Sequence, residues 1–109
     1  MWEFHDGVDI AVPENTEVRA AADGVVTEAR ESATWGKLLK FRAAGREGEY
    51  EVMYAHLNKV LVGAGEEVKK GQAVALSGRT GLATGAHLHF GVYKNGEAVD
   101  PAAFLKIQG

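Results

Sequence analysis

The chain has 109 residues, of which 46 % are hydrophobic and 25 % charged, and its formal net charge is −3 at pH 7. These values are typical of one globular unit, so we expect a single domain over residues 1–109 with its own core. The basic residues are scattered, which argues against a nucleic-acid partner. Cysteine is absent, which excludes disulfides and thiolate zinc sites, and no apolar run is long enough for a membrane span.

Fourteen glycines divide the sequence into short segments in which Val, Tyr, Phe and Leu partly alternate with polar residues. Such alternation predicts a mainly β fold, and the simplest architecture is one antiparallel-sheet domain folded on itself as a barrel or sandwich. In chain order, we expect strands at residues 8–12, 17–21, 24–30, 37–43, 49–57, 73–77, 88–93 and 97–99.

Turn and helix signals are fewer. Asn95-Gly96 is the firmest hairpin signal, because both central residues of a type I′ turn need positive φ. Residues 58–62 are expected to form one helical turn. A short C-terminal helix is expected to begin with Asp100 as N-cap and Pro101 as its first helical residue.

The sequence contains four histidines, at positions 5, 56, 87 and 89. In a strand through residues 86–90, His87 and His89 project from one face while Leu88 and Phe90 point to the other. A His-x-His pair on one strand face is a common metal chelate. The alternative is two histidines on a solvent-exposed strand.

The remaining candidates are weaker when taken one at a time. His5 and Asp9 share a strand face but lie about 13 Å apart if the strand is straight, so a shared ion needs the bend that Gly7 permits. An exposed carboxylate beside a loose terminus is the alternative. Alternation places His56 on the same side as Tyr54, and a buried histidine bonded to backbone is the alternative there.

Taken together and in order, these segments resemble the lysostaphin and LytM-type zinc metallopeptidases of the M23 family. Any one motif is unspecific, but the order of four histidines and one aspartate in this context is a strong signal. The matching segments are His5-x-Gly7-x-Asp9, Met53-Tyr54-Ala55-His56-Leu57, Gly65 through Gly71-Gln72, Thr80-Gly81, Thr84-Gly85-x-His87-Leu88-His89-Phe90 and Val99-Asp100-Pro101.

The resemblance implies a LytM-like fold, related to barrel-sandwich hybrids, with a groove that holds Zn²⁺ bound by His5, Asp9 and His89. Such a donor set leaves a tetrahedral ion one open position, as in catalytic zinc sites. The resemblance gives His56 and His87 the catalytic places. Because the sequence has no His-Glu-x-x-His motif, we expect one of them to act as general base and the other to stabilise the oxyanion or protonate the leaving amine.

The implied substrates are bacterial peptidoglycan peptides, cleaved outside the cytoplasm by a secreted, periplasmic or cell-wall-associated protein that is cut from a longer exported precursor. The groove loops at residues 31–36, 44–48 and 80–86 are expected to select the peptide. The chain departs from the family pattern twice: only four residues precede His5, and Gly91 stands where many members have glutamate.

Other functions stay open at this stage. A non-catalytic LytM-like domain could bind peptidoglycan or regulate a cell-wall amidase, and a purely structural zinc site is another alternative. Residues 63–75 also resemble lipoyl and biotinyl carrier domains, but Lys69 and Lys94 lack the flanking residues of a modified lysine. An exposed edge strand near the first residues could pair with another chain, so both monomer and dimer are possible.

Overall fold

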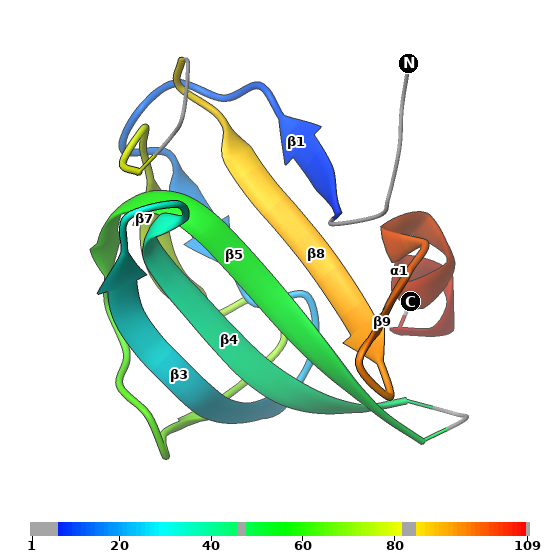
Figure 1. Ribbon diagram of the computed structural model, residues 1–109. Helices are drawn as coiled ribbons and strands as arrows, with labels where there is room; N and C mark the ends of the chain where they lie inside the picture. The colour runs from blue at the N-terminus through cyan, green and yellow to red at the C-terminus, as the bar shows by residue number, and fades with distance from the viewer. Residues whose placement is uncertain (1–6, 46–47, 82–84, 109) are drawn as a thin grey trace.

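The computed structural model describes residues 7–45, 48–81 and 85–108 (Figure 1). Within these ranges, nine strands form one antiparallel sheet and one helix follows them. This confirms the predicted mainly β fold with a short C-terminal helix. The elements are β1 (Val8–Ile10), β2 (Glu17–Arg19), β3 (Gly24–Ser32), β4 (Gly36–Gly45), β5 (Gly48–Val60), β6 (Glu67–Val68), β7 (Ala73–Ser77), β8 (Leu88–Lys94), β9 (Glu97–Val99) and α1 (Pro101–Gln108).

The order of strands along the sheet is β1-β8-β5-β4-β3-β6. Figure 1 shows β3, β4, β5 and β8 side by side, with β1 next to β8. The first half of β8 pairs with β1 and its second half pairs with β9. The strand β7 pairs with the last part of β5 and also with β2. The first and last strands of the chain therefore both lie along β8.

The long strand β5 changes partner at His56. Up to Ala55 it pairs with β8, and from Leu57 onward it pairs with β7. On its other side β5 pairs with β4, where Leu39 is the register partner of Tyr54 and Lys37 that of Leu57. Two steps along β4 therefore correspond to three along β5, so β5 carries one extra residue. His56 lies in this bulge with a left-handed backbone, φ 60°. A bulge of this kind bends a strand and redirects its side chains.

Alternation along the strands separates two faces of the sheet. The main core lies on one face, where Phe41, Val52, Tyr54 and Val92 pack against β2, β7 and Phe104 of α1. The other face carries a small apolar cluster of Leu38, Met53 and Ala55, flanked by the half-buried Trp35 and Tyr93. We call this second face the groove face.

All eight predicted strands are present, with ends that differ by a few residues. The predicted helical turn at residues 58–62 is wrong, because residues 58–60 continue β5 and pair with β7. The short β6 was not predicted, since a strand of two residues has no readable periodicity. The hairpin at Asn95 and Gly96 is confirmed by φ values of 52° and 80°. The N-cap is also confirmed, because Oδ1 of Asp100 accepts the Ala102 N–H at 2.9 Å.

The part of the chain that the structure describes contains no helix long and apolar enough to cross a membrane.

Candidate metal centre and catalytic histidines

Pairing of β1 with β8 brings Asp9 to the histidine pair. Asp9 is the register partner of His89, and Nδ1 of His89 lies 2.9 Å from Oδ1 of Asp9. Nε2 of His87 lies 3.7 Å from the same carboxylate oxygen. The two imidazoles therefore share one face, as the alternation predicted, while Leu88 and Phe90 pack on the core side. Residues 80 positions apart in the sequence thus meet through the strand register.

Gly7 allows β1 to lie this close to β8. Its φ is 117°, and a Cβ at this position would collide with the carbonyl oxygen of Phe90 and the Cα of Gly91. Only glycine combines this backbone angle with so close an approach. His5, the predicted third ligand, lies outside the described residues.

His56 faces the other histidines and not the core, so its predicted orientation beside Tyr54 is wrong. The Tyr54 ring packs on Phe90 in the core, with centroids 5.5 Å apart. The His56 ring centroid lies 5.0 Å from that of His87 and 6.3 Å from that of His89. The extra residue and left-handed backbone at the bulge account for the change of face, and histidine adopts this backbone region more often than most residues.

Two hydrogen bonds to backbone carbonyls define the proton positions on the candidate catalytic histidines. Nδ1 of His56 lies 2.7 Å from the Thr80 carbonyl oxygen, and Nδ1 of His87 lies 3.0 Å from the Gly85 carbonyl oxygen. A carbonyl only accepts, so each neutral ring carries its proton on Nδ1 and exchanges protons at Nε2. Burial lowers the pKa of His56 below its usual value, and the bond to Thr80 offsets this only in part.

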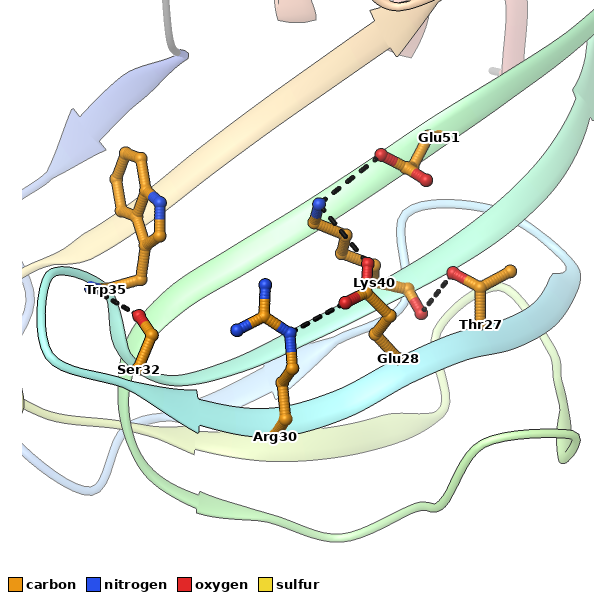
Figure 2. A network of polar contacts seen from close by, with 7 residues as sticks. All are labelled: Thr27, Glu28, Arg30, Ser32, Trp35, Lys40 and Glu51. Atoms are coloured by element: carbon orange, nitrogen blue, oxygen red, sulfur yellow. Dashed lines mark hydrogen bonds and ion pairs between the residues drawn. The ribbon is translucent and has the colours of Figure 1, made fainter.

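Trp35 belongs to the site but was not singled out from the sequence. Its ring centroid lies 4.7 Å from that of His89 and 5.8 Å from that of His56, and its carbonyl accepts the His56 N–H at 2.8 Å. The Trp35 N–H in turn donates to Oγ of Ser32 at 2.9 Å (Figure 2). The available signal was one large aromatic residue in an otherwise polar turn between two expected strands.

A cleft of about 530 Å³ lies on the groove face, and Trp35 forms part of its wall. Met53 and Tyr93 also line it, together with cationic and anionic side chains of β4 and β5. Figure 2 shows Lys40 between Glu28 and Glu51, with Nζ 3.4 and 3.7 Å from their carboxylate oxygens. The cleft thus offers apolar and charged surface of both signs next to the histidines, a mixture suited to a peptide.

The residues present fit a zinc ion. An imidazole nitrogen and a carboxylate oxygen are both zinc donors, and those of His89 and Asp9 already face each other. Within residues 7–45, 48–81 and 85–108 there is no group of three or more His, Cys, Asp or Glu side chains arranged to hold a metal ion.

The fold is that of the lysostaphin and LytM-type peptidase domains. The catalytic domain of lysostaphin from Staphylococcus simulans superimposes with a TM-score of 0.83 at 36 % identity, covering 94 % of this chain and 79 % of that one. A zinc-containing peptidase from Vibrio cholerae gives a TM-score of 0.81 at 39 % identity, covering 88 % of this chain and 29 % of that one. Residues 3–101 match the sequence profile of Peptidase family M23, and the chain belongs to this family.

The relatives of similar sequence are named as peptidases. An uncharacterized metalloprotease of Haemophilus influenzae is 48 % identical over 96 % of this chain and 22 % of its own length. The peptidoglycan DD-endopeptidase ShyA of Vibrio cholerae is 38 % identical, with 88 % of this chain and 22 % of that protein covered. The glycyl-glycine endopeptidase ALE-1 of Staphylococcus capitis is also 38 % identical, with 96 % and 30 % covered. The chain therefore spans between a fifth and a third of these relatives.

Proposed function

We propose that this chain is the catalytic domain of a zinc-dependent endopeptidase that hydrolyses peptide bonds in the cross-links or stem peptides of bacterial peptidoglycan. One observation carries the proposal: Asp9 of β1, His56 of β5 and His89 of β8 gather with His87, which directly precedes β8, beside Trp35 of the cleft wall. The names of the relatives support the substrate class, since they include a peptidoglycan DD-endopeptidase and a glycyl-glycine endopeptidase.

Asp9 and His89, together with His5, are the proposed zinc ligands. A bound zinc ion polarises a carbonyl and lowers the pKa of a coordinated water, which makes peptide hydrolysis accessible near neutral pH. Nδ1 of His89 lies 2.9 Å from Oδ1 of Asp9, so a zinc ion held by these two atoms would take the place of a proton between them.

His56 and His87 are the proposed proton carriers. The bonds from their Nδ1 atoms to the Thr80 and Gly85 carbonyls leave Nε2 as the reactive nitrogen of each ring. One ring, in its neutral form, accepts the proton of the attacking water at Nε2; the other, when protonated on both nitrogens, donates from Nε2 to the developing oxyanion or to the leaving amine. The lowered pKa of His56 favours its neutral, proton-accepting form at neutral pH.

The cleft beside Trp35 is the proposed binding surface for the peptide on one side of the scissile bond. Its volume of about 530 Å³ is in the range of ligand sites, and it holds side chains of both charge signs. Because peptidoglycan lies outside the cytoplasm, we further propose that the domain acts in the periplasm or cell wall, or is secreted.

The proposal is tested by incubating zinc-loaded protein with purified peptidoglycan and identifying the soluble fragments and their new amino termini by mass spectrometry. We expect fragments that a chelator abolishes and added zinc restores, and none from the His87→Ala variant. Zinc-loaded protein that binds peptidoglycan but releases no fragment would contradict the enzyme proposal and favour a non-catalytic regulatory domain.

A further inference from the structure

His56 is held in an unusual conformation by two segments far apart in the sequence. Its φ of 60° lies in the left-handed region, which is unfavourable for a residue with a Cβ. Its backbone N–H donates to the Trp35 carbonyl at 2.8 Å, and its Nδ1 donates to the Thr80 carbonyl at 2.7 Å. The first bond fixes the backbone of the bulge and the second fixes the ring.

The two carbonyl-bearing segments are fixed to each other through two glycines. A Cβ on Gly36 would collide with Oγ1 and the carbonyl carbon of Thr80, and would lie 2.7 Å from the nitrogen of Gly81. A Cβ on Gly81 would lie 2.7 Å from the Trp35 carbonyl carbon and would also collide with the nitrogen of Gly36. Backbone therefore packs directly on backbone, so movement of one segment is transmitted to the other.

The Thr80 hydroxyl ties this pair of segments to the bulge itself. It donates to the Leu57 carbonyl at 2.6 Å and accepts the Lys37 N–H at 3.1 Å. Lys37 and Leu57 are register partners across β4 and β5, directly beside the extra residue of β5. The hydroxyl thus bridges the two strands at the place where the bulge opens their pairing.

We propose that Trp35, Gly36, Thr80 and Gly81 form a clamp whose role is to hold His56 as the neutral tautomer with its proton on Nδ1 and with Nε2 facing the reaction. These four are positioning residues, because they act through His56. The link to catalysis rests on the proposed function, in which Nε2 of His56 transfers a proton. The effect on the tautomer does not depend on that function.

The side chain of Trp35 adds a second constraint. Its indole lies against both His56 and His89, with ring centroids 5.8 and 4.7 Å apart. The indole therefore lies beside the His56 ring in a tilted contact, while Nδ1 of that ring is hydrogen-bonded to the Thr80 carbonyl. Both constraints disfavour rotation of the ring by half a turn about its Cβ–Cγ bond, which would place Cδ2 against the Thr80 carbonyl and Cε1 where Nε2 now lies.

The test compares Thr80→Val with Thr80→Ser in the full chain. Valine has nearly the shape of threonine but lacks the hydroxyl, whereas serine retains it. The tautomer of His56 is measured by ¹⁵N NMR of the metal-free protein, above the pKa of the ring. In wild type and Thr80→Ser we expect one tautomer protonated on Nδ1, and in Thr80→Val a mixture of both. With zinc bound in equal amounts, kcat should fall about 10- to 100-fold in Thr80→Val only, with little change in KM.

A second pair of variants covers the case in which Thr80→Val does not fold. Gly36→Ala places a methyl group against Thr80, whereas Gly71→Ala has a similarly positive φ of 87° and nothing within 4 Å of the added atom. We expect mixed tautomers in Gly36→Ala and the wild-type tautomer in Gly71→Ala.

A single Nδ1-protonated tautomer in Thr80→Val or Gly36→Ala would overturn the clamp, as would an equal loss in Thr80→Ser and Thr80→Val. Failure of the wild-type protein to cleave peptidoglycan would count against the proposed function alone, because the tautomer is measured without substrate or zinc.

Discussion

Replacement of Gly7 by alanine tests whether the contact between β1 and β8 determines the position of Asp9. The added Cβ would lie 2.7 Å from the Cα of Gly91, whereas ordinary van der Waals contacts begin at 3.4 Å. The strand β1 must then retreat by roughly 0.7 Å or more, because the obstacle is backbone and not a flexible side chain. Asp9 lies two residues further along the same strand and moves with it.

Such a displacement exceeds the tolerance of about 0.2 Å on metal–ligand distances. We therefore expect the zinc affinity of Gly7→Ala to fall about 10- to 100-fold, equivalent to about 1.4–2.7 kcal/mol. The matched control is Gly48→Ala, since Gly48 has nearly the same φ, 123° against 117°, but nothing within 4 Å of an added Cβ. The control shares the backbone strain without the collision, so its zinc affinity should stay within about twofold of wild type.

The assay is competition for zinc with a chromophoric chelator at fixed pH, on protein shown by circular dichroism to be folded. Equal zinc affinity in Gly7→Ala and Gly48→Ala would refute the reasoning. It would mean either that β1 adjusts without moving Asp9 or that Asp9 does not bind the metal.

Three further predictions concern stability. Tyr54→Phe removes both backbone hydrogen bonds of a buried hydroxyl and should lower the free energy of unfolding in urea by about 1–3 kcal/mol. Tyr50→Phe should cost less, since the Tyr50 hydroxyl makes no hydrogen bond within the described part of the chain. Burial raises the pKa of the Tyr54 hydroxyl, so its contribution to the free energy of unfolding is complete below about pH 10 and is lost as the pH rises further. If the free energy of unfolding of Tyr54→Phe fell with rising pH as steeply as that of wild type, this prediction would be wrong. Asp100→Ala removes the hydrogen bond from the Ala102 N–H and should lower the free energy of unfolding in urea by about 1 kcal/mol. The control Glu97→Ala, at an exposed strand position, should leave the free energy of unfolding nearly unchanged. An equal loss of stability in both variants would contradict the N-cap role of Asp100.

Local sequence patterns predicted much of the fold because the relevant interactions are local. Alternation predicted that His87, just before β8, and His89, within it, share one face, and the two positive-φ positions at Asn95 and Gly96 are a property of the turn itself. Asp100 followed by Pro101 likewise carried its own helix-start signal. The short β6 carried none, since two residues cannot show a period.

The candidate site depends on interactions that a local pattern does not contain. The orientation of His56 follows from one extra residue in β5 opposite β4, which is a property of the strand pair. The contact of Asp9 with His89 follows from the register of β1 on β8, and only the family resemblance had grouped these two residues. Trp35 joins the site both through its indole, which packs on His56 and His89, and through its carbonyl, a group that every residue type has. Residue type could therefore indicate the ring contacts but not the hydrogen bond to the His56 N–H.

The central claim divides four side chains into two that hold zinc and two that carry protons. The most direct test is to measure bound zinc per chain and release of peptidoglycan fragments for single alanine variants of Asp9, His89, His56 and His87. We predict that the first two variants lose both zinc and cleavage, and that the last two keep about one zinc per chain while cleavage is lost. Loss of zinc from the His56 and His87 variants, or cleavage that survives in either, would contradict the account.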